Sequence, residues 1–464
     1  MFKITVKTKY EEKTATFNQK ILLWDALNQM GFKVSKPCGG KGICGNCKVI
    51  ANGEMVASCK TYTNANTLIE YNTDIENIQG ITDGAKLVYD KKPLIESGYG
   101  IAVDIGTTTI AAYIYKFPEC ELMDVKCVSN NQAIYGADVI SRIEYSNNGG
   151  LETLKNLVSE QIKELSSGYD IKKYVITGNT TMLHLLTGKN PCGIGVYPFT
   201  PETLFGGWYD NAYLPRCISA YIGADITTAI LATDMLSKNI SLMVDIGTNG
   251  EMALWYNGRL ICCATATGPA FEGANISSGV PAISGAINKV YIENEKIGYT
   301  TINNKPALGI CGSGLIDAVS CMLKLGIIDE TGYLENDFEI ADSGIYITQE
   351  DIRNFQLAKS AVRAGIDTLL YECNINCDKL EAFYIAGGFG SFINIESAVK
   401  VGLIPPDALK KVIFCGNSAG IGATMILQNR HFIKTTESIA KKAQCIELSV
   451  NEYFMNKYIS NMLF

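Results

Sequence analysis

Histidine is scarce in this sequence, which contains only His184 and His431 among its 464 residues. This scarcity excludes metal sites built from several histidines and mechanisms that need several histidine-based dyads. His184 lies in the apolar stretch TTMLHLL, where we expect a hydrogen-bonded structural histidine.

Long hydrophobic runs are also absent. No segment reaches the run of about 18 apolar residues that a membrane-spanning helix needs. The opening MFKITVKTKYEEK alternates apolar and polar residues, unlike a signal or transit peptide. We therefore expect a soluble cytoplasmic protein with no membrane partner.

Basic residues are not in excess. The 40 Lys and Arg are outnumbered by 47 Asp and Glu, which gives a formal net charge of -7, and they are spread thinly along the chain. Nucleic-acid-binding proteins usually carry a basic face. No DNA or RNA partner is expected.

Cysteine, in contrast, is abundant, and four of the 16 cysteines lie at metal-ligand spacing. Cys38, Cys44 and Cys47 in KPCGGKGICGNCKV follow a C-x5-C-x2-C pattern, and Cys59 follows in VASCKT. Three ligands on one glycine-rich loop with a distant fourth are typical of a plant-type [2Fe-2S] cluster. Zinc is the alternative, but structural zinc sites normally show two separated C-x2-C pairs. We predict a [2Fe-2S] site.

The residues around these cysteines predict a compact β-grasp module. FKITVKT and KTATFN alternate as half-buried strands do, and ILLWDALNQMG is typical of a short helix that ends at Gly31. We assign residues 1–90 to this ferredoxin domain and 91–99 to a short linker. The length of the chain leaves room for about two further folding units.

Two similar segments follow the linker. AVDIGTTTIAAYIY begins at Ala102 and MVDIGTNGEMALWY begins at Met243, and each predicts a strand, a tight turn and a second strand. A Walker loop or a dinucleotide fingerprint would lead into a helix instead. Glycines, backbone N–H groups and hydroxyls in such turns bind phosphate well. The candidate nucleotide-binding residues are Gly106, Thr107, Thr108, Thr109, Gly247, Thr248, Asn249 and Gly250.

Asp104 and Asp245 end the first strand of each repeat. A carboxylate facing a phosphate repels it unless Mg2+ and its waters lie between the two. We therefore expect both aspartates to organise Mg2+ with ATP. Either turn alone would be weak evidence, because Asp-x-Gly-Thr also occurs in ordinary tight turns.

The paired hairpins resemble the phosphate motifs of the actin, sugar kinase and heat-shock chaperone ATPase superfamily. A third element, YIAGGFGSF, resembles the adenosine motif of that superfamily through Gly387 and Gly388. The resemblance implies an α+β protein, in which the β-grasp module precedes an α/β ATPase of two ribonuclease-H-like halves, about 100–240 and 241–464. The small-residue helix starts at Gly223 and Gly416 are expected to pack the two halves together.

The whole chain is similar to the reductive activators of corrinoid-dependent enzymes. Besides the motifs above, the similarity rests on five stretches: NQAIYGADVISRI, GNTTMLHLL, TGPAFEGANISSG, CGSGLIDAV and EYFMNKYISNMLF. It implies an ATP-hydrolysing enzyme that passes one electron from its cluster to the cob(II)alamin of a corrinoid protein, in a methyltransferase or O-demethylase system. A low-potential electron donor is implied, and a homodimer is expected. Several family members carry a linker and an extra middle domain, whereas here the ferredoxin module runs into the first phosphate motif with little between, so we expect this chain to lack the middle domain.

Several residues are assigned more specific roles by hypothesis. Glu251 or Gln132 positions the water that attacks ATP, and Ser277 or Ser278 approaches the corrin ring. A Ser/Gly loop that only packs the ATPase halves is an equally good interpretation of these serines. The competing function is a sugar-type small-molecule kinase with a redox-sensing iron-sulfur module, although no stretch clearly supplies its carboxylate base.

Overall fold

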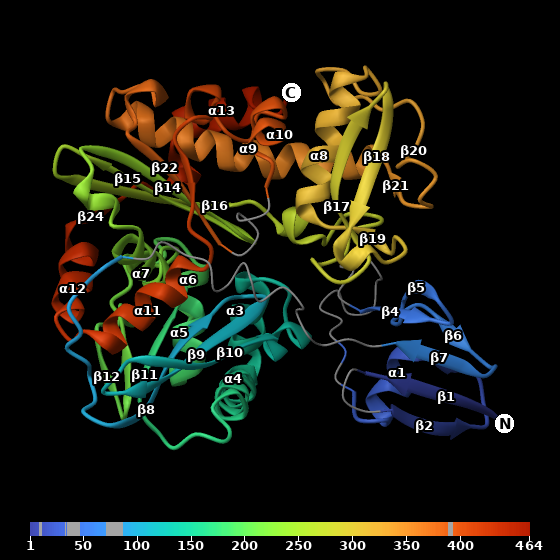
Figure 1. Cartoon of the computed structure of the whole chain (residues 1–464), viewed down its shortest axis with the longest axis horizontal. Coiled ribbons are helices and arrows are strands. Elements are labelled where there is room, and N and C mark those ends of the chain that lie inside the picture. The colour runs from blue at the N-terminus through green and yellow to red at the C-terminus, as the bar shows by residue number, and fades with distance from the viewer. Residues whose placement is uncertain (9–11, 33, 35–46, 71–86, 388–392) are drawn as a thin grey trace.

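The computed structural model describes residues 1–8, 12–32, 34, 47–70, 87–387 and 393–464 (Figure 1). Cys38, Cys44 and Gly388 lie outside these residues. No helix in the described part of the chain is long and apolar enough to cross a membrane.

The N-terminal module is a five-stranded sheet with one helix. Its strands run in the order β2-β1-β7-β4-β5, with β1 antiparallel to β2 and parallel to β7. Its elements are β1 Phe2–Lys7, β2 Glu12–Phe17, β3 Ile21–Leu22, α1 Leu23–Gln29, β4 Lys48–Ala51, β5 Glu54–Ala57, β6 Tyr62–Thr63 and β7 Thr67–Glu70. Helix α1 is followed by Gly31 at a φ of +90°, which suits glycine. The two predicted opening strands and the helix are confirmed.

The rest of the chain contains two six-stranded sheets. Their orders are β10-β9-β8-β11-β13-β12 and β24-β16-β15-β14-β22-β23. The first contains β8 Gly98–Ile105, β9 Thr109–Phe117, β10 Glu121–Ser129, β11 Ile171–Gly178, β12 Gly207–Tyr209 and β13 Ala212–Leu214. The second contains β14 Ile240–Ile246, β15 Asn249–Tyr256, β16 Arg259–Ala266, β22 Ala382–Ala386, β23 Val412–Phe414 and β24 Ala443–Cys445.

The two sheets share one topology. In each, the first three strands form an antiparallel meander, and two later strands add in parallel beside the first. Strand β8 therefore corresponds to β14, and β11 corresponds to β22. The internal repeat is confirmed as a duplicated half, and both predicted strand-turn-strand hairpins are present.

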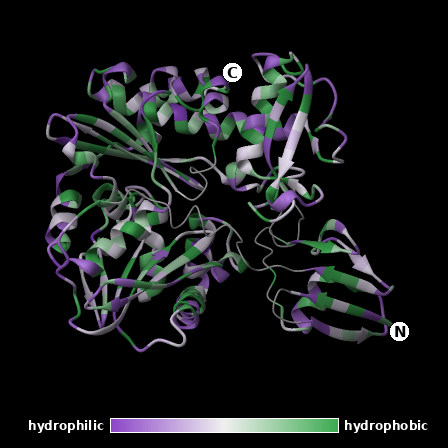
Figure 2. Ribbon diagram, viewed as in Figure 1, coloured by the Kyte–Doolittle hydropathy of each residue, from purple (hydrophilic) through white to green (hydrophobic). Residues whose placement is uncertain are grey.

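Helices α7 Ala224–Thr233 and α11 Ser418–Gln428 pack against each other between the two sheets (Figure 1). A Cβ on Gly422 would lie 2.0 Å from the carbonyl oxygen of Thr228, so only glycine permits this close approach. Figure 2 shows that the strands of the second sheet are largely hydrophobic, as sheets covered by helices should be. The expectation that the small-residue helix starts pack the two halves together is confirmed.

An insertion between β16 and β22 forms a separate lobe beside the N-terminal module (Figure 1). It consists of β17 Ala286–Glu293, β18 Lys296–Thr301, β19 Gly309–Ile310, α8 Gly312–Lys324, β20 Phe338–Glu339 and β21 Tyr346–Ile347. The long helix α9 Gln349–Glu372 leads from this lobe back across the second sheet. The remaining helices are α3 Val139–Tyr145, α4 Leu151–Leu165, α5 Thr180–Thr187, α6 Cys192–Gly195, α10 Ile395–Lys400, α12 Phe432–Lys442 and α13 Glu452–Ser460.

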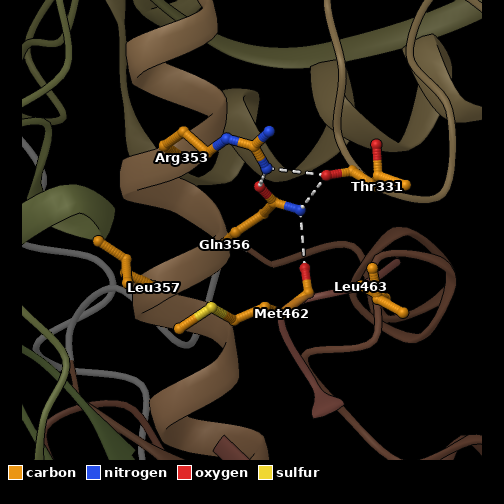
Figure 3. A pocket seen from close by; sticks show the side chains of 6 residues that line it. All are labelled: Thr331, Arg353, Gln356, Leu357, Met462 and Leu463. Atoms are coloured by element: carbon orange, nitrogen blue, oxygen red, sulfur yellow. Dashed lines mark hydrogen bonds between the residues drawn. The ribbon is translucent and has the colours of Figure 1, made fainter. Parts of the chain in front are cut away.

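The C-terminal residues are fixed on helix α9 (Figure 3). The Gln356 side chain donates to the carbonyl oxygens of Met462, at 2.7 Å, and Thr331, at 3.0 Å. The buried ammonium of Lys359 donates to the carbonyl oxygen of Leu463. Burial lowers the pKa of Lys359 to about 8. The small cavity in Figure 3 is therefore part of a structural anchor, away from the DIGT hairpins.

Deletion of residues 461–464 should destabilise the protein. The amide of Gln356 and the ammonium of Lys359 would lose buried acceptors, at a cost of about 2–5 kcal/mol in the free energy of unfolding. Urea unfolding followed by far-UV circular dichroism measures the change. Lys434→Ala, an exposed change on α12, is the control, and an equal midpoint for the deletion and this control would contradict the prediction.

Candidate functional site

The two DIGT turns form matching corners at the ends of β8 and β14. The N–H of Gly106 donates to the carbonyl oxygen of Thr109 at 2.8 Å, and the N–H of Gly247 donates to that of Asn249 at 3.0 Å. A Cβ on Gly106 would lie 2.9 Å from the Thr109 oxygen, so a side chain there would force the turn open. The first turn therefore needs its glycine in order to close tightly, whereas a Cβ on Gly247 would make only ordinary contact, 3.6 Å from the Asn249 oxygen.

Glu272 lies between the two turns. Its carboxylate accepts a hydrogen bond from the hydroxyl of Thr108 at 2.7 Å through Oε2, and from that of Thr248 at 2.9 Å through Oε1. One anionic group thus bridges both hairpins, and here it takes the place of the phosphate oxygens that these hydroxyls are suited to bind. Glu272 is the one acidic residue of the stretch TGPAFEGANISSG, and it was not predicted as a site residue from the sequence.

Four acidic residues at or near the two turns interact electrostatically with one another. Burial, followed by the nearby Asp225 carboxylate, raises the pKa of Asp104 and of Asp245 to about 7. Burial also raises the pKa of Asp225 itself to about 6. Glu251, opposite Asp245 in the β14–β15 ladder, has its pKa raised well above the usual value by burial and then by Asp225 and Asp245. The four acidic groups disfavour one another's charge.

A divalent cation fits this arrangement, because it would offset the mutual repulsion of the carboxylates. Among the residues that the structure describes, no three His, Cys, Asp or Glu side chains are close enough together to bind a metal directly. Mg2+ normally keeps several waters and takes only one or two carboxylates. The geometry therefore suits an Mg2+ that the aspartates hold partly through water, together with phosphate oxygens.

The described part of the predicted adenosine element, which ends at Gly387, lies against the second hairpin. Gly387 follows β22 at a φ of +88°, and a Cβ there would lie 2.6 Å from Oδ1 of Asp245. The neighbouring Gly388 lies outside the described residues. Strand β22 pairs in parallel with β14, which brings this glycine beside the DIGT turn.

Gly387→Ala should therefore weaken nucleotide binding as well as add backbone strain. The added methyl group would displace the Asp245 carboxylate, and we expect ATP hydrolysis to fall at least about tenfold, one step of 1.4 kcal/mol. Gly344→Ala is a matched control, since its φ of +73° imposes similar strain but its Cβ would contact nothing within 4 Å. Equal ATPase rates for the two variants would contradict the prediction.

A buried polar network supports the first hairpin. The side-chain amide of Asn130 donates to the carbonyl oxygen of Gly106 at 2.9 Å, and the Arg142 guanidinium donates to that of Thr107. Gln132 is fully buried, where its amide donates to Leu154 O at 2.9 Å and accepts from Arg142 at 3.3 Å. Both ends of the Gln132 amide are thus occupied by protein groups. The network favours Glu272 over Gln132 as the residue nearest to phosphate.

Two of the four predicted cluster ligands are described, and they lie together. The sulfur atoms of Cys47 and Cys59 are 3.1 Å apart, and both residues are buried in the core of the N-terminal module. Cys38 and Cys44 lie outside the described residues. Two adjacent, buried thiols, the first of them only three residues after Cys44 in the sequence, fit a metal cluster.

The loop that contains the two candidate corrin-contacting serines is held on helix α9. The N–H and the hydroxyl of Ser277 donate to Oδ1 of Asp351, at 2.6 and 3.0 Å. The hydroxyl of Ser278 accepts from the N–H of Tyr346 at 3.3 Å. Ser277 is nevertheless exposed, so the loop presents a small-residue surface.

The prediction for His184 is confirmed: it is buried, with Nδ1 2.7 Å from the carbonyl oxygen of Thr180, as expected of a structural histidine. Cys373 and Cys377, spaced C-x3-C, are buried thiols whose pKa values are raised by burial.

The fold and the site define an actin- and sugar-kinase-like ATPase that is fused to a small sheet module with paired cysteines. The family models agree: residues 239–464 match the C-terminal domain of RACo, the ASKHA domain, and residues 99–238 match the RACo middle region. The chain belongs to the RACo family. The match to the middle region shows that the expected lack of a middle domain is wrong, because that region forms the first of the two sheet-containing halves.

Named relatives share most of the chain. The corrinoid activation enzyme RamQ of Eubacterium limosum is 33% identical over 418 residues, which cover 79% of this chain and 70% of RamQ. The [Co(II) methylated amine-specific corrinoid protein] reductase of Methanosarcina barkeri is 28% identical over 415 residues, covering 78% and 76%. A solved structure of a reductive activator for corrinoid, iron-sulfur protein superposes with a TM-score of 0.72 at 27% identity, over 100% of this chain and 98% of that one.

Proposed function

We propose that this protein is an ATP-dependent reductive activator of a corrinoid protein. Cys38, Cys44, Cys47 and Cys59 hold a [2Fe-2S] cluster, which when bound supplies one electron at low potential. That electron converts the partner's cob(II)alamin to cob(I)alamin, and an external low-potential donor returns one electron to the protein. The named relatives support this function over that of a sugar-type kinase.

The observation that carries the ATP-dependent part is the position of Glu272. Because Thr108 and Thr248 both donate to one carboxylate, the two hairpins converge on a single anionic group. Asp104 and Asp245 would hold Mg2+ at this position. The turn residues of both hairpins would bind the phosphates, and Asn249, next to the second turn, belongs to this set. Water activation is assigned to Glu272 or Glu251.

The need for ATP follows from redox energetics. A plant-type cluster has a reduction potential of about −400 mV. Transfer of one electron from it costs about 2.3 kcal/mol for each 100 mV by which the acceptor's potential is more negative than the cluster's. An ATPase whose two states bind the partner with different affinities shifts the electron-transfer equilibrium by the difference between the two binding free energies. Closure of the two halves on nucleotide, about the α7–α11 contact, is the change that would bring about this shift.

The direct test is reduction of a purified cob(II) corrinoid protein, with Ti(III) citrate as the electron source and the anaerobically prepared holoprotein as the catalyst. We expect the cob(II) absorption to decay only when Mg2+ and ATP are both present. ATP-independent reduction, or transfer of phosphate to a sugar, would overturn the proposal. The cluster's absorption spectrum, recorded first, separates a [2Fe-2S] site from zinc.

We also propose that the Ser277–Ser278 surface approaches the corrin ring. Ser277→Ala should slow cob(II) reduction more than Ser278→Ala, because Ser277 is exposed while Ser278 is turned toward Tyr346. The ATPase rate without the partner should stay unchanged in both variants. Unchanged cob(II) spectra and turnover in both would remove this part of the proposal.

The remaining assignments belong to the same proposal. They are the domain division into 1–90, 91–99, 100–240 and 241–464, a homodimer formed through the ATPase halves, and a cytoplasmic location. The family models divide the chain at nearly the same place, between residues 238 and 239.

A further inference from the structure

The N-terminal module contacts the ATPase through the residue that follows a cluster cysteine. The ammonium of Lys48 donates to the carbonyl oxygens of Ser277, at 3.1 Å, and Gly279, at 2.8 Å. Lys48 directly follows Cys47 and begins strand β4. The contact therefore joins the cluster site to a loop that lies more than 220 residues further along the chain.

An apolar contact accompanies this polar one. Met55, on strand β5, packs against the buried cluster of Val280, Ala286 and Cys311 in the inserted lobe. Figure 1 shows β4 and β5 facing the end of that lobe that carries β19. The interface thus combines a cation at backbone carbonyls with a flexible apolar side chain, as an interface that has to separate and re-form would.

The loop that Lys48 contacts is continuous with the nucleotide site. Glu272, which bridges the two hairpins, is only five residues before Ser277. The segment between them is folded on itself: a Cβ on Gly273 would lie 2.3 Å from the carbonyl oxygen of Val280, and one on Gly279 would lie 2.1 Å from that of Gly273. Because its two ends are in contact, a shift of the backbone at Glu272 would reach the carbonyls that hold Lys48.

We propose that residues 272–279 form a nucleotide-sensitive docking site for the N-terminal module, with Lys48 as the residue that positions the cluster against it. The proposal rests on the proposed function for the identity of the cluster and of the nucleotide. The phosphates of ATP compete with Glu272 for the hydroxyls of Thr108 and Thr248. Nucleotide binding then moves the loop and loosens the docked module, which is freed to approach the partner.

The same coupling must act in the other direction. Because linkage is reciprocal, a module that docks better when Glu272 bridges the hairpins also lowers the affinity for nucleotide. A variant that cannot dock should bind nucleotide more tightly. Typical coupling energies correspond to changes of about 5-fold or more.

The chain offers a matched pair of lysines for the test. Lys48 follows Cys47, and Lys60 follows Cys59, so each lies next to a cluster cysteine, but Lys60 is exposed and bonds to no carbonyl of the ATPase in the part of the chain that the structure describes. Lys48→Ala and Lys60→Ala therefore remove the same charge near the cluster. Only the first removes the docking contact, and Lys48→Arg should largely restore it.

Small-angle X-ray scattering of the nucleotide-free holoprotein measures docking without any corrinoid partner. We expect a larger radius of gyration for Lys48→Ala than for the wild type, Lys60→Ala or Lys48→Arg, with the same cluster spectrum in all four. A non-hydrolysable ATP analogue with Mg2+ should also increase the radius of gyration of the wild type. The dissociation constant of this analogue, from titration calorimetry, should be about 5-fold or more lower for Lys48→Ala than for the wild type.

Equal scattering and equal nucleotide affinity for Lys48→Ala and Lys60→Ala would overturn the docking proposal. That result is distinct from a failure of the proposed function, which would appear as wild-type protein that does not reduce cob(II) with ATP. Met55→Ser removes the apolar part of the interface, and it should also increase the radius of gyration of the nucleotide-free protein. A Met55→Ser variant with the wild-type radius of gyration would also count against the proposal.

Discussion

Replacing Asp104 or Asp245 with asparagine should abolish ATP hydrolysis and yet make the nucleotide-free protein more stable near pH 8. The loss of activity follows from the proposed role of both carboxylates in holding Mg2+ at the phosphates. Removal of one such electrostatic group typically costs about 100-fold or more in rate. ATPase activity should therefore fall to near background in either variant.

The gain in stability follows from the raised pKa values. Burial and neighbouring carboxylates bring the pKa of both aspartates to about 7, from the ordinary value of 3.8. Between pH 3.8 and 7 the folded protein retains protons that the unfolded chain has released, so stability falls as the pH rises through this window. Above pH 7 the full destabilisation by the charged carboxylate is present. Asparagine carries no charge, so it removes this destabilisation.

Thermal unfolding from pH 5 to pH 8 in the presence of EDTA measures this effect. We expect the wild type to lose stability over the range, and each asparagine variant to lose less. Mg2+ with ATP should flatten the wild-type profile, since cation and nucleotide bind only the folded site. Asp170→Asn, at an exposed aspartate paired with Lys172, is the control and should change neither the slope nor the ATPase rate. A steeper slope for Asp245→Asn would contradict the prediction.

Much of the fold could be predicted because its signals are local. The alternation in residues 2–8 and 13–18 predicted strands, and the paired DIGT stretches predicted two hairpins, because each pattern concerns side chains a few residues apart. The internal repeat added a prediction about the overall architecture, since a turn that occurs twice with flanking strands predicts two equivalent halves. The glycine after β22 was recognised through the resemblance of YIAGGFGSF to the adenosine motif, and the structure gives a physical reason for it, since Gly387 has a positive φ and packs against the Asp245 carboxylate.

The missed residues depend on contacts between distant segments. Glu272 lies 164 residues from Thr108, and nothing in its local sequence places it between two hydroxyls. Asp225, near the start of helix α7, was not predicted as a site residue, although its carboxylate raises the pKa of both hairpin aspartates. Nothing in the sequence around Lys48 indicates its contact with the carbonyl oxygen of Gly279, which arises only from the folded arrangement. Such pairings exist only in the folded chain.

Replacing Cys59 with serine should separate the two activities of the protein. The serine hydroxyl is a poor ligand for iron, and loss of even an outer partner of a metal site costs about 10–100-fold in affinity or activity. We expect cob(II) reduction to fall at least about tenfold, along with the iron content and the visible absorption of the cluster. Hydrolysis of ATP should continue, because Cys59 lies in the separate core of the N-terminal module.

Cys192→Ser is the matched control, at a partly exposed cysteine of helix α6 in the ATPase. It should leave the iron content, the spectrum and both activities at wild-type values. Iron analysis and the electron paramagnetic resonance spectrum of the dithionite-reduced protein report on the cluster independently of turnover. If a Cys59→Ser protein without iron still reduced cob(II) at the wild-type rate, the electron would have to pass through another group. If it instead lost ATPase activity while folding normally, the N-terminal module would be required for hydrolysis itself, and the docking contact of Lys48 would be the route to examine.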